Sequence, residues 1–179
     1  MDETRKTIVL GIVFVLCLAA AYVENIFFFN SLADRLSDPL VSMLAIFVHN
    51  VLVVSLILVA MTFYVSLVLT FFPKRKYEYV VLEHPRLFAF VFTLVILLVS
   101  ILRTSTLLQG RVFLESLALV VLVSAPNGII EGYGIFQCIN KTLNRNMTLK
   151  DLAVVYSIFF IAAVIETAYT QALLSTVTT

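Results

Sequence analysis

The sequence predicts an all-α protein, a polytopic transmembrane helix bundle with five spans whose fourth span is broken at Pro126-Asn127-Gly128. Composition is the first reason, because 61% of the 179 residues are hydrophobic and 13% are charged. A soluble domain usually has about 45–50% apolar residues and about 25% charged residues. Length is the second reason, because five apolar stretches can each cross about 30 Å of hydrocarbon as a helix. None of them alternates polar and apolar residues with the period of two that a membrane barrel requires.

The five stretches form one predicted transmembrane domain, residues 1–179. They cover residues 7–29, 40–72, 87–108, 112–139 and 152–174. The first could be mistaken for a signal peptide, but its apolar run is too long and no small-residue cleavage site follows, so we expect a retained helix. The second has 33 residues, or about 50 Å as a helix, and must tilt strongly or begin as an interfacial segment.

The fourth stretch contains the features that predict its break. Pro126 removes a backbone donor and Gly128 loosens the chain, so we expect a kink or break there. At membrane depth such a break requires neighbouring protein or water to satisfy the freed backbone groups, which places this span inside the bundle. Gly128 and Gly132 are also spaced as a G-x-x-x-G pair, which lets another helix approach closely.

The basic residues predict the orientation. Nine of the twelve Lys and Arg residues fall on one side of the predicted topology, namely Arg5, Lys6, Lys74, Arg75, Lys76, Arg86, Lys141, Arg145 and Lys150. The other three, Arg35, Arg103 and Arg111, fall on the opposite side. The positive-inside rule therefore predicts a multi-pass protein of the cell membrane with a cytoplasmic amino terminus and an external carboxy terminus.

Ionisable residues inside the predicted spans are the candidate functional residues. They are Glu24, His49, Arg103, Glu131 and Glu166. Because a charge at mid-bilayer costs roughly 2.5–3.5 kcal/mol, these side chains must face inward, pair or be protonated. Arg103 matches Glu24 and Glu166 in depth, so it forms a candidate ion pair with one of them. Glu131 has no basic residue at matching depth, and we expect it to be protonated or to accept a hydrogen bond from Asn127 one turn earlier.

Several function classes find no support. A net charge of +1 provides no basic face for nucleic acid, and Cys17 and Cys138 lie in apolar stretches rather than in a disulfide framework. With two histidines, and without H-E-x-x-H, C-x-x-C or Walker sequences, we expect no metal, no cofactor and no catalytic residue. Ser55 or Ser124 with His49 would be a very weak signal for an intramembrane enzyme.

Three short motifs carry a family resemblance. Residues 125–132, Ala-Pro-Asn-Gly-Ile-Ile-Glu-Gly, resemble the P-H-G-x-x-E element of the stage II sporulation protein M family. Residues 162–170, Ala-Ala-Val-Ile-Glu-Thr-Ala-Tyr-Thr, are similar to its A-A-x-I-E-A-x-x-T ending, and residues 47–50, Phe-Val-His-Asn, resemble its F-x-N-N element. The three motifs stand in the family's order, and the resemblance as a whole covers nearly the whole chain. The resemblance implies a multi-helix membrane protein; the family's sporulation members work with cell-wall-degrading partners during engulfment, as the membrane anchor of that assembly.

Two departures from the family pattern predict a contact. The chain has His49 where the family has asparagine and Asn127 where it has histidine. If these side chains face each other, the exchange preserves one donor–acceptor contact. We therefore expect His49, Asn50, Asn127 and Glu131 to form one intramembrane polar cluster between the second and fourth spans.

The sequence leaves two functions open. The first is a non-enzymatic membrane scaffold that binds partner membrane or envelope proteins, or further copies of itself, among membrane lipids. The alternative is a small transporter or channel for a proton, a small ion or a lipid, with Glu131 at the broken fourth helix. The polar residues could also serve packing alone.

Overall fold

A computed structural model describes residues 3–30, 38–72, 76–109 and 114–177. The side chains of residues 25, 27, 29–30, 76–79, 102–109, 114–124 and 173–177 lie outside this description. The described residues are helical apart from short turns and contain no strand, which confirms the all-α prediction. The helices are α1 (Glu3–Asn30), α3 (Pro39–Phe71), α4 (Lys76–Glu83), α5 (Pro85–Gln109), α6 (Leu114–Leu143) and α7 (Leu149–Val177).

The long helices match the five predicted stretches, and α4 is an additional short helix between the second and third. Three helical segments in the described residues are long and apolar enough to cross a membrane: Glu3–Glu24, Pro39–Phe71 and Leu149–Ala172. In α5 the apolar segment is the shorter Pro85–Ile101. The count of five spans stays a prediction.

Helix α6 differs from the expectation of a broken fourth span. It is one continuous α-helix from Leu114 to Leu143, with Pro126 inside it. Proline removes only its own N–H from the hydrogen-bond ladder, and the flanking turns keep helical geometry around a single missing bond. The predicted break at residues 126–128 is therefore wrong as an interruption of the helix.

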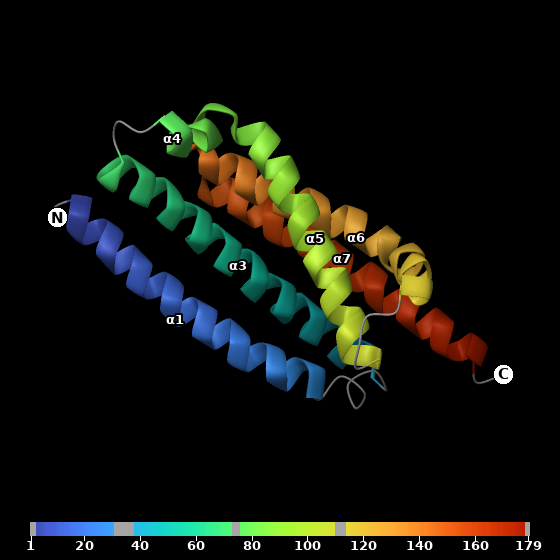
Figure 1. Cartoon of the computed structure of the whole chain (residues 1–179). Helices are drawn as coiled ribbons and strands as arrows, with labels where there is room; N and C mark the ends of the chain where they lie inside the picture. Colours follow the sequence, from blue (N-terminus) through green and yellow to red (C-terminus); the bar gives the residue numbers. More distant parts are fainter. Residues whose placement is uncertain (1–2, 31–37, 73–75, 110–113, 178–179) are drawn as a thin grey trace.

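Consecutive long helices run in opposite directions in Figure 1, and side-chain contacts show this for α1 with α3 and for α6 with α7. Thr7 near the start of α1 meets Ser66 near the end of α3, whereas Glu24 meets His49. In Figure 1 the amino terminus, the α3–α5 connection and the α6–α7 turn lie at one end of the bundle, and the carboxy terminus lies at the other. Helix α3 contacts α1, α6 and α7, whereas α5 packs on α6 and makes only a few contacts with α4.

Two helix ends are fixed by their own side chains. The Asp38 carboxylate caps α3 by accepting from the N–H groups of Leu40, at 2.9 Å, and Val41, at 3.3 Å, as expected of a good N-cap residue. Thr148 and Asp151 cap α7 reciprocally: the Thr148 N–H donates to Asp151 Oδ2 at 3.0 Å and the Asp151 N–H donates to Thr148 Oγ1 at 3.2 Å.

The turn between α6 and α7 is closed from both sides. Arg145 has φ 57°, and the N–H groups after α6 donate back to the Thr142 and Lys141 carbonyls, which is a Schellman end. Lys141 then pairs with Asp151 across the turn, Nζ to Oδ1 at 3.2 Å. This hairpin sets α7 against α6 in a fixed register.

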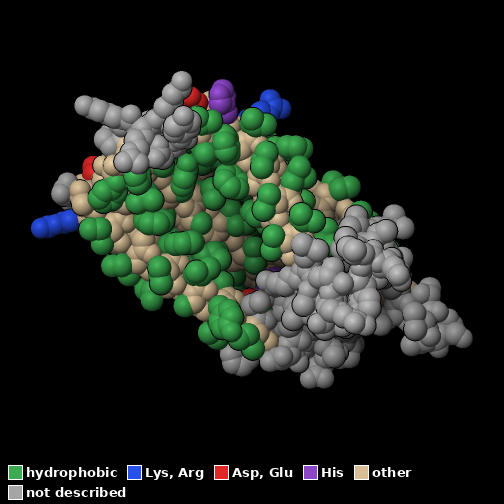
Figure 2. All heavy atoms as spheres, viewed as in Figure 1, with side chains coloured by type: hydrophobic (Ala, Val, Ile, Leu, Met, Phe, Trp, Pro, Cys, Tyr) green, Lys and Arg blue, Asp and Glu red, His purple; other side chains and the backbone are tan. Residues whose placement is uncertain are grey.

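The apolar core lies among α3, α5, α6 and α7. Its buried members are Val54, Val65, Ala89, Ile135, Cys138, Ile139, Leu143, Val155 and Phe159. Many other large apolar side chains are exposed, and Figure 2 shows hydrophobic side chains spread over the visible face, with charged groups mainly at its upper and left edges. Such a surface suits contact with lipid or with another apolar partner rather than with water.

Candidate functional site

Adjacent residues His49 and Asn50 on α3 contact different neighbouring helices. His49 Nδ1 lies 3.0 Å from Glu24 Oε2 of α1, and the two side chains are 15% and 24% exposed. The buried Phe28 ring stacks on the His49 imidazole at a centroid distance of 4.5 Å. With a hydrogen on Nδ1, His49 donates to the carboxylate, and a charged imidazolium would make this contact an ion pair.

Helix α6 carries the two polar residues that link it to α3 and α7. Asn50 Nδ2 donates to Glu131 Oε1 at 2.8 Å, and Asn127 Nδ2 donates to Glu166 Oε2 at 2.8 Å. Asn127 and Glu131 are one helical turn apart, so they project from the same face of α6. Asn127 Oδ1 is buried and accepts no hydrogen bond among the described groups.

These contacts form what we call the polar layer. Its members are Glu24, His49, Asn50, Asn127, Glu131 and Glu166. The layer joins α1, α3, α6 and α7 and holds three carboxyl groups, one imidazole and two amides. An amide N–H donates to Glu131 and another to Glu166, and the His49 imidazole contacts Glu24. These contacts lower the cost of placing the polar groups away from water.

The polar layer contains all four members of the cluster that the sequence proposed. The pairs of Asn50 with Glu131 and of Asn127 with Glu166 were not expected, whereas the expected hydrogen bond of Asn127 with Glu131 also acts on the Glu131 carboxyl. His49 and Asn127 each have a glutamate partner on another helix, and their direct contact stays a prediction. The sequence signal that could have shown this is the adjacency of His49 and Asn50, because side chains of adjacent residues on a helix point in different directions.

The candidate ion pair of Arg103 with Glu24 or Glu166 is untested. The Arg103 side chain lies outside the described ones. The described partner of Glu24 is His49, and that of Glu166 is Asn127. Both glutamates therefore have a polar partner without invoking Arg103.

The residues of the predicted break and packing motif have separate surroundings. Pro126 is exposed, and a Cβ on Gly128 would meet no described atom within 4 Å. A Cβ on Gly132 would lie 2.9 Å from Leu97 Cδ1 of α5. Only the second glycine of the pair therefore supports close approach of another described helix.

Two further polar contacts between helices were not predicted. Thr7 Oγ1 of α1 lies 2.7 Å from Ser66 Oγ and 3.0 Å from Thr70 Oγ1 of α3. Ser55 Oγ of α3 lies 2.9 Å from the Tyr156 hydroxyl of α7. The sequence signal for the first contact was the spacing of Ser66 and Thr70, because residues four positions apart lie on the same face of a helix.

The chemistry shown by the polar layer is hydrogen bonding between helices. In the described part of the chain no group of three or more His, Cys, Asp or Glu residues is arranged to hold a metal ion. A proton on Glu131 or Glu166 would give the Asn127 carbonyl oxygen the donor that it lacks.

Comparison of the chain with protein-family models, with curated proteins and with solved structures finds no match.

Proposed function

We propose that the chain is a non-enzymatic integral membrane scaffold that binds partner membrane or envelope proteins, as its resemblance to the stage II sporulation protein M family implies. The observation that carries the proposal is the pairing of the polar layer. The six side chains form three pairs, each between two helices, while many large apolar side chains are exposed on the outer surface. These pairs hold α1, α3, α6 and α7 together, and the apolar exterior supports contact with lipid or with partner helices.

We propose that this scaffold crosses the membrane five times, with a cytoplasmic amino terminus and an external carboxy terminus. The alternating direction of the long helices supports this topology, because it brings the amino terminus, the α3–α5 connection and the α6–α7 turn to one end (Figure 1). These are the segments that carry nine of the twelve basic residues, and such an excess is typical of the cytoplasmic side.

The scaffold proposal is tested by purification of the tagged full chain from its native membranes after mild cross-linking. We expect membrane or envelope proteins to copurify in constant molar ratio. A chain that purifies alone, as a homo-oligomer in every detergent tested, would contradict partner binding.

A second candidate function is a proton-coupled transporter or channel. The unpartnered Asn127 Oδ1 beside two carboxyl groups favours it, because one proton moving between Glu131 and Glu166 would satisfy that oxygen. Carboxyl groups near the midplane between helices are typical of proton relays.

The test is proton flux into vesicles that contain the purified chain. Transport requires that Glu131→Gln abolishes the flux, whereas the matched variant Glu83→Gln, which changes an exposed carboxylate outside the polar layer, leaves it intact. Flux equal to that of protein-free vesicles, for protons and for common ions, would exclude this function.

A further inference from the structure

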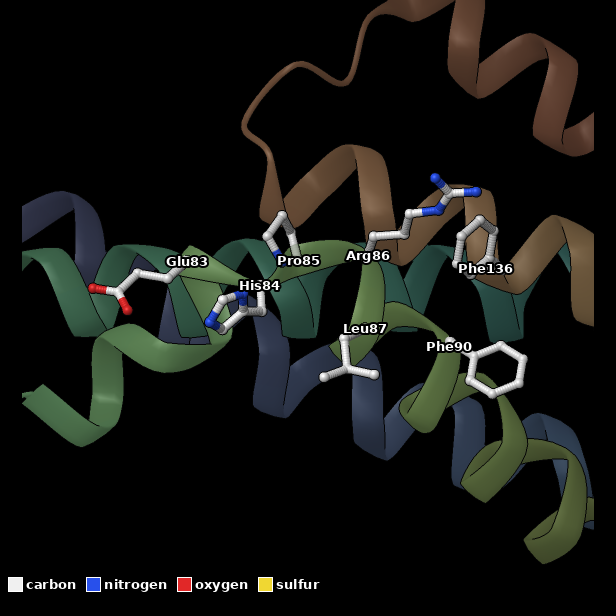
Figure 3. A pocket seen from close by; sticks show the side chains of 7 residues that line it. All are labelled: Glu83, His84, Pro85, Arg86, Leu87, Phe90 and Phe136. Atoms are coloured by element: carbon white, nitrogen blue, oxygen red, sulfur yellow. The ribbon is translucent and has the colours of Figure 1, made fainter.

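A pocket lies where α4 meets α5, beside α6. It has a volume of about 630 Å³, and Figure 3 shows side chains from both ends of the α4–α5 corner and one aromatic ring from α6 around it. The polar lining residues are Glu83, His84 and Arg86, and the apolar ones include Leu87, Phe90 and Phe136. The pocket is thus polar at the helix corner and apolar along the helix that follows.

The apolar part continues along α5. Leu87 and Phe90 are 60% and 55% exposed, and Leu94 and Leu98 on the same face are exposed to a similar degree. Residues spaced by three or four positions form one stripe on a helix. A flexible hydrocarbon chain that begins at the pocket can therefore lie along this stripe over more than two turns.

The polar part has the chemistry to bind a phosphate group. Arg86 is exposed, and in Figure 3 its guanidinium group lies on the side of Phe136, whereas the Glu83 carboxylate points to the opposite side of the pocket. Guanidinium groups pair with phosphate oxygens through two parallel hydrogen bonds. The exposed His84 imidazole also lines the pocket, and in Figure 3 it lies on the side of Glu83, away from the Arg86 guanidinium.

We propose that this pocket binds an anionic phospholipid, with the phosphate paired to Arg86 and an acyl chain lying over Leu87 and Phe90. Charge complementarity selects this occupant: in sequence, residues 73–86 hold four basic residues (Lys74, Arg75, Lys76 and Arg86) against two acidic ones (Glu78 and Glu83). Segments with a basic excess at the cytoplasmic end of a span attract anionic lipid. The inference rests on the membrane location alone and does not require the scaffold to have a protein partner.

Native mass spectrometry of the full chain in detergent tests the site, with phosphatidylglycerol and phosphatidylcholine as probes. We expect bound phosphatidylglycerol to exceed bound phosphatidylcholine, and Arg86→Gln to weaken phosphatidylglycerol binding about fivefold or more. The matched control is Lys150→Gln, which removes an exposed cation at the same end of the bundle but outside the pocket. This control should change binding less than twofold.

A second variant separates the acyl-chain contact from the charge. Phe90→Ser should weaken the binding of both long-chain lipids, because it removes an exposed ring from the stripe without touching the core. If Arg86→Gln and Lys150→Gln weaken phosphatidylglycerol binding equally, the proposed site is wrong and the lipid binds through general surface charge. Full displacement of the lipid by inorganic phosphate would overturn it in favour of a free-anion site.

Discussion

Asn50 on α3 donates a 2.8 Å hydrogen bond to Glu131 on α6, and this contact joins the two helices within the polar layer. Replacing Asn50 by alanine leaves the Glu131 carboxyl without its donor from α3, so we expect a loss of about 1–3 kcal/mol in the free energy of unfolding. Denaturation of the purified chain in mixed micelles, followed by circular dichroism, measures this loss.

A double-mutant cycle isolates the Asn50–Glu131 contact. We expect Asn50→Ala and Glu131→Ala to show a coupling free energy of about 0.6 kcal/mol, and at most about 1.7 kcal/mol, as polar contacts between membrane helices do. Strictly additive losses would show that the two side chains do not interact in the folded protein.

Gly134 and Gly128 on α6 provide a matched test of helix packing. A Cβ on Gly134 would lie 2.6 Å from Cε2 of the buried Phe159 ring on α7, whereas one on Gly128 would meet no described atom within 4 Å. We expect Gly134→Ala to destabilise the chain by about 1–3 kcal/mol through overpacking. Gly128→Ala should be neutral or stabilising by up to about 1 kcal/mol, since alanine favours the helix. The reverse order in a thermal-unfolding series would contradict the α6–α7 register.

Thr7 tests how α1 is attached to the bundle. Its hydroxyl contacts Ser66 and Thr70 of α3, so Thr7→Val should cost about 1 kcal/mol of stability. Thr62→Val is the matched control, because the exposed Thr62 hydroxyl bonds to the Leu58 carbonyl of its own helix. If the two variants lose equal stability, the contact between α1 and α3 contributes nothing.

Asp151 tests the turn between α6 and α7. Its carboxylate caps α7 through Thr148 and pairs with Lys141 of α6. We expect Asp151→Ala to cost about 0.5–2 kcal/mol, as the loss of a helix cap does. Lys150→Ala, at a neighbouring exposed position, should be within about 0.5 kcal/mol of the unaltered chain. A neutral Asp151→Ala would show that the turn forms without its cap.

Apolar run length predicted the long helices well, because a stretch such as residues 40–72 has no other way to satisfy its backbone in lipid. The structure makes it α3, one helix of 33 residues. Helix α4 was missed because its eight residues mix polar and apolar side chains without a long periodic pattern. The break at Pro126 was overpredicted, because a single proline leaves the flanking turns helical.

The membership of the polar layer was more predictable than its pairings. The cost of a buried polar group identified Glu131 and His49 as inward-facing. The spacing of residues within one helix does not show how that helix is rotated about its axis relative to its neighbours. The sequence therefore could not pair Asn50 with Glu131 or Asn127 with Glu166. Those pairings follow from packing, such as the close approach of Gly134 to Phe159.

The most direct test of the membrane-bundle account is the side of the membrane on which each chain end lies. Reporter domains that are active on only one side of the membrane are fused before Met1, in the α6–α7 turn and after Thr179. The account predicts cytoplasmic reporters at the first two positions and an external reporter after Thr179, because five spans separate the ends. A cytoplasmic reporter after Thr179, with a cytoplasmic amino terminus, would require an even number of spans and would contradict the five-span bundle.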